Sequence, residues 1–257
     1  MEAILLLTHE LPETVSGALT TLSILLPNML IMTTTNEGLS NALSELISRG
    51  VGEVVLVNLL GEPVSIPQGI NVRINWASPG NLVIQYLGSV LLKHLDLIRS
   101  DALGLIAKSL IALTGDPRLA LMMRWNFDIN MLGGFIRDVR SLVIDDARVL
   151  SFIDPRNVKP GLHIMCACNG SLSYTGNSLV VISMYPNLIS GMIKLVNEGL
   201  KPALAIVTPP TLNESEISLK RALLTLNVPI ITILGTEGGP HIAGSLLNAI
   251  FQVAHMG

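Results

Sequence analysis

The fold is decided by residues 180–250, which read VVISMYPNLISGMIKLVNEGLKPALAIVTPPTLNESEISLKRALLTLNVPIITILGTEGGPHIAGSLLNAI. Short apolar runs alternate in this stretch with segments of helical spacing. We predict strands at 179–182, 203–207 and 228–234, with helices at 186–198, after Pro209-Pro210 through Leu226, and at 240–253. Strands that alternate with helices are typical of a parallel sheet covered by helices on both faces.

The same alternation extends upstream to the N-terminus. We predict strands at 142–144 and 163–168, a helical region from 82 to 112, and further helical segments through Met122 and over 127–139. The first part reads as strands at 3–8, 29–32 and 52–57 with helices at 11–26 and 37–49, and residues 62–80 read as a connection. The predicted fold class is α/β. A three-layer α/β/α domain with a mainly parallel sheet spans 80–257, and a smaller βαβαβ unit spans 1–79.

Composition excludes several classes of protein. The 257 residues are 49% hydrophobic and 14% charged, with a net charge of −3 and no basic run, so neither a disordered chain nor a nucleic-acid partner is expected. Two stretches, Thr14–Asn36 and Ile164–Ile193, carry no charged side chain. Polar residues interrupt both, which favours buried strands and helix faces over membrane spans. Glu2 and the absence of a basic start argue against a signal peptide, and two cysteines one residue apart favour a cytoplasmic protein.

Residues 180–250 resemble the precorrin-8X methylmutase family of cobalamin biosynthesis. The resemblance rests on a proline that opens a helix, on E-G and P-A-L, and on V-P-x-I followed by a glycine loop and an N-A in the last helix. The matching positions are Pro186, Glu198-Gly199, Pro202-Ala203-Leu204, Pro209, Ser218, Val228-Pro229, Ile231, Gly235, Gly238, Gly239, Ala243 and Asn248-Ala249. Thr114-Gly115-Asp116 and the segment 143–149 resemble the family more weakly.

The resemblance implies an isomerase that moves a methyl group on a tetrapyrrole ring. It implies a corrinoid polycarboxylate as substrate, no metal or nucleotide cofactor, a homodimer, and no nucleic-acid or membrane partner. The substrate-binding residues implied or suggested are Thr114, Asp116, Pro186, Pro209, Ser218, Gly238, Gly239, His241 and Asn248. The turn at 238–241 could bind a carboxylate at a helix N-terminus, or its glycines could serve the turn alone.

The family's catalytic histidine is missing from this sequence. The best alignment puts Ala112 at its position and Ser109 at the neighbouring arginine, and no histidine lies between His94 and His163. A methyl shift on the ring needs a proton moved on and off the macrocycle, and losing a general acid or base costs about 10²- to 10⁴-fold. His241 and His94 are the candidates to replace it. The alternative is a non-catalytic tetrapyrrole-binding or partner subunit.

The N-terminal segment ILLLTHE and residues 30–60 resemble small sirohydrochlorin cobaltochelatases. His9 falls on that family's first metal-facing histidine, and the second is absent. A metal-chelating protein centred on His9, with Glu10 as a second ligand, is therefore a third hypothesis.

Two further clusters have both a functional and a structural interpretation. His163, Cys166 and Cys168 could bind metal, but two small buried residues in a strand are favoured. The cationic side chains of the middle segment could bind substrate carboxylates, but a salt-bridged surface is favoured. They are Arg124, Arg137, Arg140, Arg148, Arg156 and Lys159.

Overall fold

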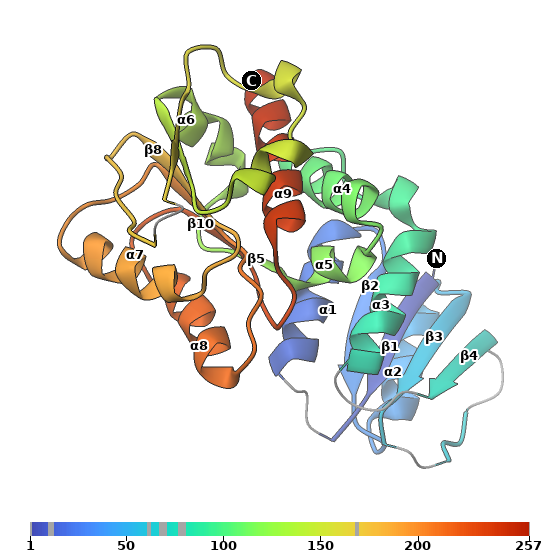
Figure 1. Cartoon of the computed structure of the whole chain (residues 1–257). Helices are drawn as coiled ribbons and strands as arrows, with labels where there is room; N and C mark the ends of the chain where they lie inside the picture. The colour runs from blue at the N-terminus through green and yellow to red at the C-terminus, as the bar shows by residue number, and fades with distance from the viewer. Residues whose placement is uncertain are drawn as a thin grey trace. The chain divides into compact units, whose positions relative to one another are not determined.

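The computed structural model describes residues 2–9, 13–60, 63–66, 71–76, 81–167 and 170–256. The chain forms two compact units, Met1–Arg99 and Ser100–Gly257, coloured blue to cyan and green to red in Figure 1. The predicted boundary between residues 79 and 80 lies before this division of the chain. Helix α3 (Asn81–Lys93) packs on α1 (Glu13–Leu25), which keeps it in the first unit.

The first unit contains a four-stranded parallel sheet in the order β2-β1-β3-β4. The strands of this sheet are β1 (Glu2–Leu7), β2 (Leu30–Thr34), β3 (Glu53–Asn58) and β4 (Asn71–Trp76). The unit also contains the helix α2 (Leu39–Ser48) and the short η1 (Leu95–Leu97). Strand β4 corrects the prediction that 62–80 is only a connection. It is an edge strand with polar residues, among them Arg73, whose Nη2 lies 2.9 Å from Glu53 Oε1.

Strand β1 shows why this unit contains so few charges. Ala3, Leu5 and Leu7 pack with α2 and β3 in one core cluster. The intervening Ile4 and Leu6 are equally buried, so both faces of the strand are covered. A parallel strand buried on both faces is a continuous apolar run rather than an alternating one.

The second unit contains a six-stranded sheet in the order β5-β10-β9-β8-β6-β7, parallel except for β5. Its strands are β5 (Met123–Trp125), β6 (Ser141–Ile144), β7 (His163–Cys166), β8 (Ser178–Ile182), β9 (Leu204–Val207) and β10 (Ile230–Ile233). Its helices are α4 (Ala102–Thr114), α5 (Pro117–Met122), η2 (Ile129–Met131), α6 (Leu132–Arg137), η3 (Ala147–Phe152), η4 (Pro155–Asn157), α7 (Asn187–Asn197), α8 (Glu214–Leu223) and α9 (Pro240–Met256).

Helices cover both faces of this sheet, as Figure 1 shows. On one face α7 and α8 contact each other and pack on β6, β8, β9 and β10. On the other face α9 contacts β9 and is itself covered by α4 and α6. The predicted three-layer α/β/α architecture with a mainly parallel sheet is confirmed.

The two uncharged stretches divide into separate elements. Thr14–Asn36 contributes to α1 and β2, and Ile164–Ile193 contributes to β7, β8 and α7. Within the described part of the chain, no helix combines the length and the apolar character that crossing a membrane requires.

Candidate ligand site at the carboxyl edge of the second sheet

The topology of the second sheet has a switch point at β6. The chain passes from β6 to β7 on one side and then crosses to β8 on the other. In open α/β sheets, ligands bind outside the carboxyl ends of the strands at such a reversal. The segments that follow β6, β8, β9 and β10 form this edge, and they begin at Asp145, Ser183, Thr208 and Leu234.

Asp145 joins the ends of β6 and β8. Its side chain is buried, at 1% exposure, and accepts four hydrogen bonds. Oδ1 accepts from Ser183 N at 2.8 Å and from Ser183 Oγ at 2.6 Å. Oδ2 accepts from Met184 N at 2.8 Å and from Tyr185 N at 3.1 Å. The carboxylate therefore fixes the turn that leads to Pro186, the N-cap residue of α7.

The loop after β10 lies directly against the segment after β9. A Cβ added at Gly238 would lie 2.3 Å from Pro210 N and 2.4 Å from the carbonyl carbon of Pro209. Gly239 has φ of 129° and its N–H donates to the Thr208 carbonyl at 2.8 Å. Backbone packing and conformation explain both glycines, so a ligand is not needed to account for them.

Lys220 on α8 forms hydrogen bonds with the backbone of the same loop. The residue is fully buried, and Nζ donates to the carbonyls of Gly235 and Glu237, each at 3.2 Å. Thr211 Oγ1 donates to the same Gly235 carbonyl at 2.7 Å. Burial lowers the pKa of Lys220 to about 8, although Glu216 and Glu237 act in the opposite direction. Ser218, the predicted site residue on α8, is exposed, whereas the buried Lys220 was not predicted.

The buried ammonium gives a prediction about pH. The pKa of Lys220 is about 8 in the folded chain against an ordinary 10.5, so between these values the unfolded chain binds more protons. Stability rises with pH in such a window. From pH 8 to pH 10, we expect the wild type to gain about 1–2 kcal/mol of unfolding free energy relative to Lys220→Met. Urea titrations of both proteins test this. Parallel pH profiles would contradict it.

Three arginines have the same local arrangement, D-x-R, at a short helix start. Arg118, Arg148 and Arg156 each place Nη2 2.6 Å from a carboxylate oxygen of the aspartate two residues earlier. Burial alone would raise the pKa of Asp116, but the hydrogen bonds from Arg118 outweigh it and lower that pKa. The salt-bridged interpretation is therefore confirmed for these three arginines.

The histidine candidates lie in different units. His241 is exposed in the first turn of α9, and its ring meets Phe152 edge-on, with the centroids 6.2 Å apart. His94 lies in the first unit, where its Nε2 is 3.3 Å from Glu2 Oε2. The structure describes all five histidines, and His241 alone follows a carboxyl strand end of the second sheet. Ala112 is exposed near the end of α4.

Two other predicted site residues make local structural contacts. Asn248 Oδ1 accepts from Asp154 N at 3.0 Å and from Asn157 Nδ2 at 2.9 Å, which braces η4 against α9. Thr114 Oγ1 donates to the Leu110 carbonyl at 2.6 Å and accepts a hydrogen bond from Asp116 N at 3.3 Å. These contacts account for both side chains within the fold.

The predicted metal positions do not form a ligand cluster. His9 is exposed after β1, and Glu10 lies outside the described residues. Strand β7 is exposed, so the prediction of a buried cysteine pair is wrong for Cys166. Cys166 is disulfide-bonded, and Cys168 lies outside the described residues. In the part of the chain that the structure describes, no three His, Cys, Asp or Glu side chains could hold a metal ion together.

Comparison with known proteins identifies the class of fold. Residues 162–253 match the family model of precorrin-8X methylmutase. The chain is also similar to the cobalt-precorrin-8 methylmutase of Methanocaldococcus jannaschii, with 34% identity over 79 residues, which are 30% of this chain and 37% of that protein. The chain thus matches little more than a third of this curated relative.

Solved structures extend the match at the level of fold. A precorrin-8X methylmutase from Thermus thermophilus superposes with a TM-score of 0.55 and 15% identity, covering 66% of this chain and 95% of that one. A precorrin-8X methylmutase related protein superposes with a TM-score of 0.51 and 18% identity, and the match covers 63% of this chain and 98% of that one. The predicted resemblance to the methylmutase family is confirmed in sequence over 162–253. None of these matches bears on the chelatase resemblance, which stays a prediction.

Proposed function

We propose that this chain is a precorrin-8X or cobalt-precorrin-8 methylmutase-like protein of cobalamin biosynthesis. In this proposal, a corrin-type tetrapyrrole binds at the carboxyl edge of the second sheet. The observation that carries it is that the family match, 162–253, includes β8, β9 and β10 with the loops that form this edge.

The edge offers groups that suit a polycarboxylate. The N-terminus of the 17-residue helix α9 lies here, and the positive end of a helix dipole attracts anions. Arg118 interacts electrostatically with Glu237 of the glycine loop, and Arg148 with Tyr185. Each guanidinium has five N–H donors, and its aspartate engages Nε and Nη2, so Nη1 is left for a substrate carboxylate.

We propose His241 as the group that moves the proton during methyl migration. In that reaction the methyl group leaves one ring carbon and bonds to another, and a proton taken from the ring is returned to it. An imidazole titrates near neutral pH and suits both steps. Lys220 is less suited because its Nζ already donates to two carbonyls of the loop.

His241→Asn should lower the single-turnover rate constant of methyl migration by about 10²- to 10⁴-fold, the usual loss for a general acid or base, and should leave corrinoid binding within threefold. The measurement is single-turnover conversion of precorrin-8X, followed by absorbance. His163→Asn, an exposed histidine of β7, is the matched control and should keep the wild-type rate. A wild-type rate for His241→Asn would exclude this role.

A second function is favoured because Ala112 occupies the position predicted for the catalytic histidine. In this second function, the chain binds a tetrapyrrole or serves as a partner subunit, without catalysis. Titration with hydrogenobyrinic acid and assay of precorrin-8X turnover separate the two. Binding with turnover supports the isomerase, and binding without turnover supports the second function. Absence of binding overturns both tetrapyrrole proposals.

We also propose a homodimer, as the family resemblance implies, and a cytoplasmic location, which the spacing of the two cysteines favours. Strand β7 supports self-association because it is an edge strand whose Ile164 and Met165 are 48% and 41% exposed. An exposed apolar edge strand favours pairing with another chain. Sedimentation equilibrium should give twice the 27.5 kDa chain mass. A single-chain mass at micromolar concentration would contradict this.

A further inference from the structure

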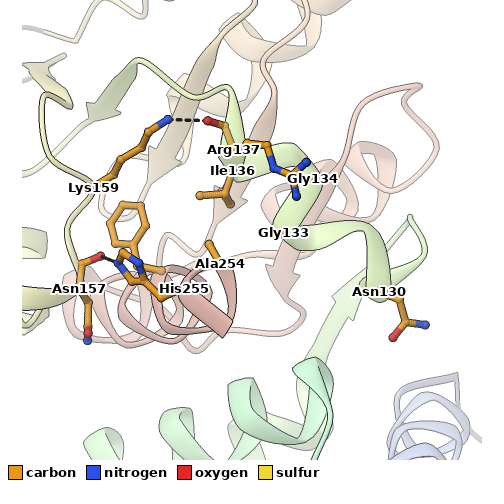
Figure 2. A pocket seen from close by; sticks show the side chains of 10 residues that line it. Asn130, Gly133, Gly134, Ile136, Arg137, Asn157, Lys159, Ala254 and His255 are labelled. Carbon is orange, nitrogen blue, oxygen red and sulfur yellow. Dashed lines mark hydrogen bonds between the residues drawn. The ribbon is translucent and has the colours of Figure 1, made fainter. Parts of the chain in front are cut away.

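A separate pocket of about 430 Å³ lies in the second unit, away from the site described above. Figure 2 shows it between α6, the last turns of α9 and the chain before β7. The lining residues include Gly133, Gly134 and Arg137 of α6, Lys159, and Phe251 and Ala254 of α9. His255 and His241 are 14 residues apart on α9, or about 21 Å at 1.5 Å per residue, so the two sites do not overlap.

Two glycines in α6 open this pocket. Gly133 and Gly134 both have negative φ, and a Cβ added to either would meet nothing within 4 Å. The backbone therefore does not require glycine, although each costs about 1 kcal/mol relative to alanine inside a helix. What the glycines provide is a bare backbone wall facing the open space. These two positions therefore leave room for a molecule beside α6.

Two of the polar side chains that line the pocket, Arg137 and Lys159, are cationic. Arg137 is exposed, and its guanidinium has no hydrogen-bond or ion-pair partner within the described part of the chain. Lys159 Nζ donates to the carbonyls of Arg137 and Val139, which leaves its third N–H. His255 Nε2 lies 3.0 Å from the Asn157 carbonyl. None of the lining residues is an Asp or Glu.

The floor of the pocket is apolar. Phe251 and Ile136 are 1% and 2% exposed, and Ala254 adds a methyl group from α9. Small-molecule sites are typically apolar cavities of about 300–1,000 Å³ with a few oriented polar groups. This pocket has that size and composition, with positive charge on one side.

We propose that this pocket binds a small organic carboxylate with an apolar body. The carboxylate lies between Arg137 and Lys159, and the apolar body lies along the glycine wall and Ala254, above the buried Phe251 and Ile136. The site is independent of the proposed tetrapyrrole function because it shares no residue with the carboxyl edge.

The test uses benzoate and hexanoate as probes, with benzylamine as a cation of similar shape to benzoate. Ligand-observed NMR on the full chain should show saturable binding of at least one carboxylate and none of benzylamine. Arg137→Gln should weaken binding about tenfold or more, as loss of a hydrogen bond to a charged group does. Lys201→Gln, an exposed lysine outside the pocket, should leave it unchanged.

A variant whose pocket is filled by a larger side chain tests the proposal most sharply. Gly134→Leu and Ala254→Leu each place a side chain into it from a different helix, so that one remains if the other fails to fold. Loss of carboxylate binding in a folded variant supports the proposal. No saturable binding of either carboxylate to the wild type, or unchanged binding in a folded filled variant, overturns it. Corrinoid binding should be unaffected, which separates this outcome from the failure of the proposed function.

Discussion

Asp145→Asn is expected to lower the free energy of unfolding of the second unit by about 2–4 kcal/mol. The wild-type carboxylate accepts two hydrogen bonds on each oxygen, from Ser183 on one and from Met184 and Tyr185 on the other. The asparagine NH₂ would face donors at one of these positions. At least one backbone N–H would then be buried without an acceptor, and the turn into α7 would lose its anchor.

Urea unfolding monitored by Trp125 fluorescence measures this effect in the second unit, with Trp76→Phe as the common background. Asp146→Asn is the matched control. Asp146 caps η3 and pairs with Arg148, which is 64% exposed, and asparagine caps equally well. The control should lose less than about 1 kcal/mol. Equal losses of unfolding free energy in the two variants would show that the four hydrogen bonds of Asp145 stabilise the fold no more than the exposed cap of Asp146 does.

Gly238→Ala is the second large effect, with an expected loss of about 3 kcal/mol of unfolding free energy. The new Cβ would lie 2.3–2.5 Å from backbone atoms of Pro209 and Pro210. Backbone atoms between two prolines cannot move aside as a flexible side chain can. The loop after β10 must therefore separate from the segment after β9, and corrinoid affinity should fall with it.

Gly134→Ala provides the comparison for this substitution. Its Cβ would meet nothing within 4 Å in α6, so the variant should be as stable as the wild type or gain up to about 1 kcal/mol. Thermal unfolding of both variants measures this difference in stability. Wild-type stability for Gly238→Ala would mean that the loop does not lie against Pro209 and Pro210.

The regular elements could be predicted because their signal is local. Residues 179–182 and 230–233 are apolar runs with a helix after each, and both are fully buried strands in the structure. Strand β5 was missed because its three residues lie between two segments predicted as helical and are too few to show a strand pattern of their own. Only pairing with β10, more than 100 residues away, makes it a strand. Strand β4 was missed for a similar reason, since it depends on β3 for its partner.

The site residues also divide into those with a local sequence signal and those that depend on distant partners. The glycine loop and its prolines could be found by motif, because the backbone approach at Gly238 dictates the residue type. Asp145 and Lys220 could not, because their partners are 38 and 15 residues away and follow from strand order. One signal was available for each. Asp145 directly follows an apolar strand, and Lys220 is a cation on the apolar side of α8, next to Leu219 and Leu223.

We propose that a tetrapyrrole binds at the carboxyl edge of the second sheet. Hydrogen–deuterium exchange of the full chain, with and without hydrogenobyrinic acid, measures this binding segment by segment. We predict slower exchange at 183–186, 208–212 and 235–242, with no change around Gly133 and His255. Unchanged exchange at all three segments, or protection confined to residues 1–99, would contradict the account.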